Sequence, residues 1–172
     1  MERDEELLLA VLNSEPVIDG LVSDHLDGDP GERFAHRWGG TGSDAEREGL
    51  RRVREALHAA IRESSADPLS AVSDIVSTAV KVPQVTSEGL SWRLEAPADF
   101  VLSMETIAAW SSVLTRHPGR LRPCANAECN LFLIDRSRPG TAKWCSMAAC
   151  GNRMKARAYA DRARSQDGRR TD

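Results

Sequence analysis

Apolar residues recur at intervals of three and four along the first two thirds of the chain, a spacing that predicts amphipathic helices. The clearest stripe is Leu50, Val53, Leu57 and Ile61, which follows a capping box that begins at Ser43. Two Asp-Pro pairs each supply an N-cap and a first helical residue for further helices. The expected helices cover residues 5–13, 29–39, 43–61, 67–78 and 97–116, with a turn over 13–20.

The two later helices are apolar enough to contribute to a core. In the helix over 67–78, the expected buried side consists of Leu69, Val72 and Val76. In the helix over 97–116, the residues expected to point mostly inward are Phe100, Val101, Met104, Ile107, Ala108, Val113 and Leu114. These faces, together with the earlier helices, are sufficient to close a modest core.

Between residues 80 and 94 the apolar period changes from helical to alternating. Apolar residues alternate with polar ones on both sides of a Gly-containing loop over 86–89. This pattern predicts a short β-hairpin. Pro83 confines its strand to an edge or a bulge, because proline has no N–H group for a sheet. The expected fold class is therefore α+β, mainly helical with one small hairpin.

The last third of the chain has a different pattern. The run over 131–134 is apolar and predicts a buried strand, and Pro139-Gly140 predicts the turn of a hairpin. After Cys145, an Ala-rich and Arg-rich segment with Ser146 as N-cap predicts a final helix. We expect that helix to dock on its neighbours through Met154, Ala158 and Tyr159.

Composition also predicts the cellular compartment of the protein. The chain has 172 residues, 41% hydrophobic and 28% charged, which suits one globular domain with a small appendage. The opening residues are acidic, unlike a secretory leader, and no apolar run approaches the length of a membrane span. We therefore expect a cytoplasmic protein without a membrane partner, in which cysteines stay reduced.

Charge divides the chain into two unlike parts. Residues 1–115 carry 10 Lys and Arg against 21 Asp and Glu, a net charge of −11. Residues 116–172 carry 13 against five, a net charge of +8. A basic segment on an acidic body is typical of a protein that meets a polyanion through one part only. The alternative is a basic helix that docks on its own acidic domain.

All four cysteines lie in this basic segment, in the order C-x4-C-x15-C-x4-C. Two short loops and a longer connector can bring four thiolates into the tetrahedron that zinc prefers. We therefore predict one structural zinc ion held by Cys124, Cys129, Cys145 and Cys150. Two disulfides and an iron–sulfur cluster are less favoured alternatives. Four thiolates leave no open position for water, so the predicted site stabilises a fold and catalyses nothing.

Basic and polar residues surround the predicted metal site. Basic side chains in the connector and the final helix provide a surface that suits phosphates. Asn152 could read a base edge or cap the cysteine loop, and for Arg153 a structural role is favoured. Trp144 is expected to cover the metal, with base stacking as the alternative. The candidate nucleic-acid-binding residues are Arg136, Arg138, Lys143, Asn152, Arg153, Lys155, Arg157 and Arg164.

The stretch WCSMAACGNRMKAR, preceded by LFLIDRSRPG, resembles the CGNR zinc finger of bacterial proteins. The likeness covers about residues 121–160, and all four cysteines fall where that motif has them. In that family the finger follows a mostly helical ABATE domain, and the proteins are proposed stress-induced transcription regulators. A looser likeness to that domain spans residues 5–115. Where such proteins carry an Asp-containing run ending in Asn-Thr, this chain has AVLNSEP.

The resemblance implies an ABATE-like domain, and we expect this mostly helical domain over 1–117 and the finger over 118–165; the polar composition of residues 166–172 predicts a disordered tail. The resemblance implies transcriptional regulation with zinc and DNA. Our hypothesis is a zinc-dependent regulator that binds double-stranded DNA, whose helical domain senses a small-molecule effector or mediates assembly as a homodimer. The alternative is a zinc-stabilised adaptor for RNA or a protein. An enzyme is not expected, because the four histidines are scattered and no phosphate-binding glycine loop is present.

Overall fold

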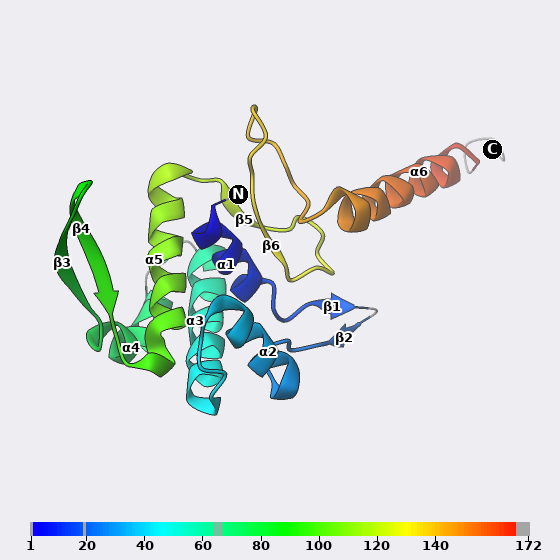
Figure 1. The fold of residues 1–172 in the computed structure, drawn as a ribbon. Helices are drawn as coiled ribbons and strands as arrows, with labels where there is room; N and C mark the ends of the chain where they lie inside the picture. Colours follow the sequence, from blue (N-terminus) through cyan, green and yellow to red (C-terminus); the bar gives the residue numbers. More distant parts are fainter. Residues whose placement is uncertain (1, 19, 64, 66, 168–172) are drawn as a thin grey trace.

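Two elements project from a helical body in opposite directions (Figure 1). They are the β-hairpin of β3 (Val80–Thr86) and β4 (Gly89–Glu95), and the C-terminal helix α6 (Asn152–Asp167). The structure is a computed structural model that describes residues 2–18, 20–63, 65 and 67–167. No helix within these ranges combines the length and apolarity needed to cross a bilayer.

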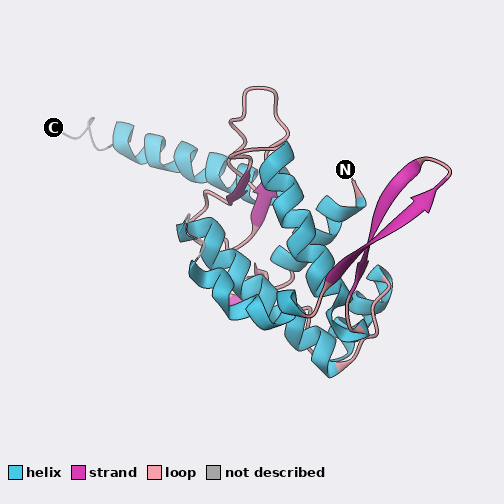
Figure 2. Cartoon of the chain, turned by 90° about the vertical axis from the view of Figure 1, so that its left-hand side faces the viewer, coloured by secondary structure: helices cyan, strands magenta, loops and turns pink. Residues whose placement is uncertain are grey.

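The body is built mainly from helices, with short 3₁₀ turns between them (Figure 2). Every segment expected to be helical contains a helix, and the hairpin lies where the alternating pattern placed it. The α+β fold class is therefore confirmed. The helical elements are α1 (Arg3–Leu12), α2 (Gly28–Trp38), α3 (Asp44–Glu63), η1 (Asp67–Val72), α4 (Ser73–Ser77), η2 (Ala98–Phe100) and α5 (Val101–Arg116).

Helix α3 is the centre of the body, and its apolar stripe lies where its spacing predicted. Leu50, Val53 and Leu57 are fully buried and Ile61 is partly buried. The stripe contributes to two apolar clusters, one shared with α1 and α5 and one shared with α1 and α2. The predicted capping box is half formed, because the Ser43 hydroxyl accepts from the Glu46 N–H at 3.1 Å. The buried Glu46 carboxylate instead accepts from the Gly42 N–H at 2.8 Å.

Helix α2 begins two residues earlier than its Asp-Pro signal predicted. Asp27, not Asp29, is the N-cap, and its carboxylate accepts from the Gly28 N–H. At the other end, Gly39 has φ of 92°, a left-handed conformation that costs glycine little and ends the helix as expected.

The buried face expected for residues 67–78 was partly wrong. Residues 67–72 form a 3₁₀ helix, which winds more tightly than an α-helix and turns the following residues. As a result Ile75 is buried together with Val72, whereas Val76 is exposed. Ala108 and Leu114 on α5 are also exposed, because α5 is apolar around much of its surface and α1, α3 and α4 pack against only part of it.

The segment after α1 was expected to be only a turn, but it contains a small strand pair. Strands β1 (Val17–Ile18) and β2 (Leu21–Val22) pair in antiparallel fashion. Two-residue strands are too short to leave an alternating pattern in the sequence.

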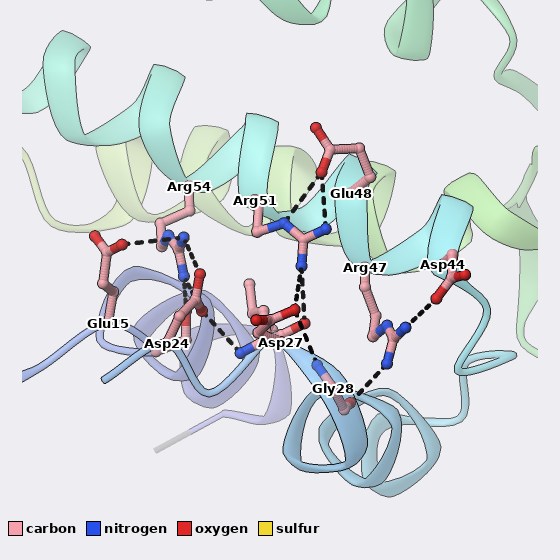
Figure 3. A network of polar contacts seen from close by, with 11 residues as sticks. Glu15, Asp24, Asp27, Gly28, Asp44, Arg47, Glu48, Arg51 and Arg54 are labelled. Atoms are coloured by element: carbon pink, nitrogen blue, oxygen red, sulfur yellow. Dashed lines mark hydrogen bonds and ion pairs between the residues drawn. The ribbon is translucent and has the colours of Figure 1, made fainter. Parts of the chain in front are cut away.

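A buried arginine fastens the segment after α1 to α3 (Figure 3). The Arg54 side chain is almost fully buried and donates to both carboxylate oxygens of Asp24, at 2.7 and 2.8 Å. It also donates to the Ser14 hydroxyl at 2.9 Å and lies 3.5 Å from Glu15. Burial alone would raise the pKa of Asp24, but its hydrogen bonds from Arg54 and the Leu26 N–H hold that pKa below its usual value. Asp24 is therefore ionised at neutral pH.

We predict that Arg54→Ala destabilises the protein by about 3 kcal/mol, because it leaves the Asp24 charge without its partner in a partly buried position. Urea unfolding measures the change. Arg52→Ala is the matched control on the same helix, since its pair with Asp74 is solvent-exposed and is expected to contribute less than about 1 kcal/mol. Equal losses in the two variants would contradict the role of Arg54.

Candidate zinc centre and basic helix

The cysteine segment is joined to the body through a two-stranded sheet. Strands β5 (Leu121–Pro123) and β6 (Phe132–Ile134) are antiparallel, with Pro123 opposite Phe132. The expectation of a hairpin that turns at Pro139-Gly140 was wrong, since β6 pairs with the strand before it. Leu121, Phe132 and Ile134 belong to the same apolar cluster as α1 and α3. The predicted regions 1–117 and 118–165 therefore share one core.

Phe132 is the residue through which the two regions are joined. Its ring is buried and lies 4.5 Å from the His58 ring and 5.0 Å from the Arg62 guanidinium. Its backbone is held by the side-chain amide of Asn13, which accepts from the Phe132 N–H at 2.7 Å and donates to the Phe132 carbonyl at 3.1 Å. The Asn in AVLNSEP is thus occupied by backbone contacts. A second amide, that of Asn130, donates to the Glu15 carbonyl.

The cysteines lie on two loops that the sheet and a backbone hydrogen bond bring together. Cys124 directly follows β5, and its N–H donates to the Leu131 carbonyl at 2.8 Å, which extends the strand pair. Cys129 closes its loop by donating to the Asn126 carbonyl at 2.8 Å. The Ala125 N–H donates to the Lys143 carbonyl at 2.8 Å, which places the approach to Cys145 beside the first loop.

The four sulfur atoms are grouped as a tetrahedral metal site requires. They all lie within 4.8 Å of one another, and Cys145 Sγ is 3.7 Å from the Sγ atoms of both Cys129 and Cys150. A zinc ion bonded to four sulfurs at about 2.3 Å sets its sulfurs about 3.8 Å apart. The cluster is thus placed to hold one zinc ion. Among the described residues no other group of His, Cys, Asp or Glu is arranged as a candidate metal site.

Hydrogen bonds to sulfur support this arrangement. The Asn126 amide is buried and donates to Cys150 Sγ at 3.6 Å, and the Cys145 N–H donates to Cys124 Sγ at 3.5 Å. Burial raises the pKa of the Cys129 thiol to about 11 and raises that of Cys145 further. Burial also acts on Cys150, but hydrogen bonds from Asn126 and the other thiols lower the pKa of Cys150. Asn126 was not among the residues predicted for the metal site. Its position between Cys124 and Cys129, inside a predicted ligand loop, was the sequence signal that could have indicated this role.

The second cysteine pair opens a helix, as predicted. Ser146 is the N-cap of the π-helical turn η3 (Met147–Gly151), which leads directly into α6. Gly151 lies close to two side chains, because a Cβ atom there would lie 2.7 Å from Met147 Sδ and 3.2 Å from the half-buried Trp144 ring. Trp144 and Met147 thus pack against the start of the helix, beside the glycine that follows the last cysteine.

Helix α6 does not dock on the body as expected (Figures 1 and 2). Ala158 and Tyr159, two of the three residues predicted to form its docking side, are exposed, with Tyr159 at 72%. The element that α6 contacts most is η3, which precedes it in the chain. The docking prediction failed because apolar spacing on a helix shows what could be buried, not that a partner lies beside it.

The candidate nucleic-acid-binding residues fall into two groups. One group is on or beside α6, with exposed side chains: Lys143, Asn152, Arg153, Lys155, Arg157 and Arg164. Of these, Arg157 donates through Nη2 to both carboxylate oxygens of Glu128, each at 2.8 Å, and Arg164 lies 3.8 Å from Asp161. Arg136 and Arg138 are in the loop after β6, where Arg136 pairs with Glu5 of α1.

Comparison with known families agrees with this centre. Residues 120–163 match the CGNR zinc finger family model. The match includes all four cysteines, the two loops and most of α6. No curated protein matches the chain. The ABATE domain, the expected domain limits and the tail remain predictions; Gln166 and Asp167 close α6, and residues 168–172 lie outside the described residues.

Zinc removal is expected to unfold the cysteine loops, because two short loops have little apolar surface to hold them without the metal. We predict about one zinc ion per purified chain, and a loss of zinc and of α6 helicity in Cys150→Ser. Metal analysis and far-ultraviolet circular dichroism measure the two. Ala127→Ser, an exposed change in the first loop, is the control and should retain zinc. Full zinc content in Cys150→Ser would contradict the assignment.

The half-buried His58, which lies beside Phe132, makes the stability of the protein depend on pH. Burial lowers the pKa of His58 to about 4, so the folded protein keeps it neutral while the unfolded chain protonates near pH 6.5. Stability should therefore fall as the pH is lowered from 7.5 to 5, by about 1–2 kcal/mol from this group.

Nuclear magnetic resonance titration of the His58 ring measures that pKa directly. Urea unfolding of the wild type and of His58→Gln at both pH values isolates the contribution, since both proteins share the pH dependence of the thiolates. A His58 ring that titrates near pH 6.5 in the folded protein would contradict this prediction.

Proposed function

We propose that this chain is a zinc-dependent, DNA-binding transcriptional regulator of the cytoplasm. In this proposal the cysteine centre holds α6 away from the body and presents its basic side chains to double-stranded DNA. The helical body senses an effector or mediates assembly, and no catalytic activity is assigned to the chain.

The observation that carries the proposal is the exposure of α6. The helix has 16 residues, which corresponds to a length of about 24 Å, and most of its described side chains are exposed. It contains five Lys and Arg residues and two Asp residues. A helix of this size and charge fits the major groove of duplex DNA. A helix that served only to stabilise the body would bury one face, and α6 does not.

Within α6, the side chains divide into a phosphate-binding and a base-reading group. Arg153, Arg157 and Arg164 are separated by four and seven residues and lie close to one stripe of the helix. Such a row suits successive phosphates of one strand. Asn152 stands exposed at the helix start, where an amide is able to pair with adenine.

Glu128 of the first cysteine loop binds one of these arginines. Its carboxylate accepts from Arg157 Nη2, and Arg157, followed by Arg153, holds the pKa of Glu128 below its usual value. Both partners are about half exposed, so a phosphate can replace the carboxylate at little cost.

The body's role in assembly is supported by its projecting hairpin. Val85 and Leu90 are directly opposite each other, and the next pair on the same face is Pro83 and Trp92. Val85 is 88% exposed and Trp92 is 60% exposed. Exposed apolar side chains gathered on one face are typical of a protein–protein contact, which here supports the proposed homodimer.

An adaptor that binds RNA or an acidic protein is the second candidate. It is supported by the same helix, because exposed arginines bind any polyanion. Groove binding by a straight helix favours duplex DNA, since the deep groove of A-form RNA is too narrow to admit one.

We predict that Arg153→Ala/Arg157→Ala weakens binding to duplex DNA at least about tenfold at low salt, because two phosphate contacts are lost. Fluorescence anisotropy with a labelled duplex pool measures the affinity. The slope of log affinity against log salt should decrease by about 1.8, at about 0.9 for each contact. A structured RNA of equal charge is measured in parallel.

Arg33→Ala/Arg37→Ala is the matched control, since these exposed arginines have the same spacing on α2 and no ion-pair partner among the described residues. This variant should bind DNA like the wild type. If the two double variants bind duplex DNA equally, α6 is not the DNA-binding surface. Tighter binding to RNA than to duplex DNA would favour the adaptor.

A further inference from the structure

A cavity of about 530 Å³ lies where the body meets the cysteine segment. One side is formed by the end of α5 and the turn that follows it, and the other by the loop after β6. Four arginines line it, together with His117 and a single acidic residue, Asp135; the arginines are Arg116, Arg120, Arg136 and Arg138. None of the lining residues that the structure describes belongs to α6.

Two buried carboxylates, those of Glu5 and Asp135, form ion pairs with basic side chains that line the cavity. Glu5 of α1 is 1% exposed; it pairs with Arg136, and its Oε1 lies 3.1 Å from His117 Nε2 and 3.6 Å from Arg116. Asp135 has a fully buried side chain and lies 3.6 Å from Arg120. The Ser137 hydroxyl, with backbone N–H groups of Ser137 and Ala142, holds the pKa of Asp135 below its usual value. Both carboxylates therefore position the basic side chains of the cavity while remaining buried themselves.

The arginines retain hydrogen-bond donors beyond those used in these contacts. A guanidinium has five N–H donors. Arg120 uses one nitrogen, Nη1, to reach both the Ser137 carbonyl at 2.9 Å and Asp135. Arg136 uses one nitrogen on Glu5, and Arg138 has no acidic partner among the described residues. Arg116 is more fully engaged, with Glu2, Asp4 and Glu5. Arg120, Arg136 and Arg138 are therefore available to an anion.

We infer that this cavity is a binding site for the phosphate group of a small phosphorylated molecule. Guanidinium groups match the oxygen pairs of phosphate, and three of them from one loop and one turn can surround it. The cavity is large enough for a phosphate and an attached small organic group. Its lining residues come from the end of α5, the turn that follows it and the loop after β6, so a bound phosphate would contact both regions of the chain.

This inference separates Arg136 and Arg138 from the DNA surface to which the sequence assigned them. They line a cavity whose other wall belongs to the body, whereas Arg153, Arg157 and Arg164 are exposed on the projecting helix α6. The inference also goes beyond the proposed function, because the cavity does not depend on DNA binding.

The test is calorimetric titration of the full-length, zinc-loaded protein with inorganic phosphate, against sodium chloride at equal ionic strength. We expect saturable binding of phosphate and none of chloride. Arg138→Gln and Arg120→Gln should each weaken phosphate binding about tenfold, the loss of one charge-assisted contact. Arg162→Gln, an exposed change on α6, is the control and should bind phosphate like the wild type. Duplex DNA affinity should be unchanged in Arg138→Gln.

Three results would overturn the inference. The first is a response to phosphate no different from that to chloride. The second is wild-type phosphate binding in both Arg138→Gln and Arg120→Gln. The third is a loss of duplex DNA affinity in Arg138→Gln as large as in Arg153→Ala/Arg157→Ala, which would place the cavity on the DNA surface. A protein that binds phosphate but not duplex DNA would retain this inference and lose the proposed function.

Discussion

The convergence of four cysteine sulfurs is the constraint on which the C-terminal third of the structure depends. Cys124 follows β5 and Cys129 precedes β6, while Cys145 and Cys150 lie just before and within the turn η3 that leads into α6. Four thiols this close together can release their protons to one zinc ion, whose charge offsets the mutual repulsion of the thiolates. The direction of α6 follows from this constraint, because the helix has little other contact with the protein.

The cysteine segment is not an independent appendage, because Phe132 carries it into the core of the body. The ring packs against His58 and Arg62 on α3, and the amide of Asn13 binds the Phe132 backbone in the way that a neighbouring strand would. Leu121 and Ile134 of the same sheet enter this core beside Phe132. The cysteine segment is therefore packed directly against α1 and α3.

Charge is organised by burial as well as by sequence. The acidic body places two of its carboxylates where they bind arginines in or near the interior, Asp24 with Arg54 and Glu5 with Arg136. A third buried carboxylate, that of Glu46, accepts from the Gly42 N–H instead. The acidic partners of Arg157 and Arg164 on α6, which are Glu128 and Asp161, are exposed. Net charge alone showed an acidic part and a basic part of the chain. Burial shows which arginines are already paired with carboxylates and which remain available to a polyanion.

The sequence by itself determined the main helices and the hairpin of the body and the candidate metal ligands, because these depend on local spacing. The stripe on α3, the β3–β4 hairpin and the C-x4-C pairs each repeat at an interval that backbone geometry fixes. The tertiary structure decided which cations are buried or exposed. Arg54 and Arg51 look alike on one helix, yet Arg54 is buried against Asp24, whereas Arg51 pairs with the exposed carboxylates of Asp27 and Glu48. Arg136 and Arg157 looked alike as phosphate ligands, but they face different partners, since the path of the chain between them is set by contacts distant in sequence.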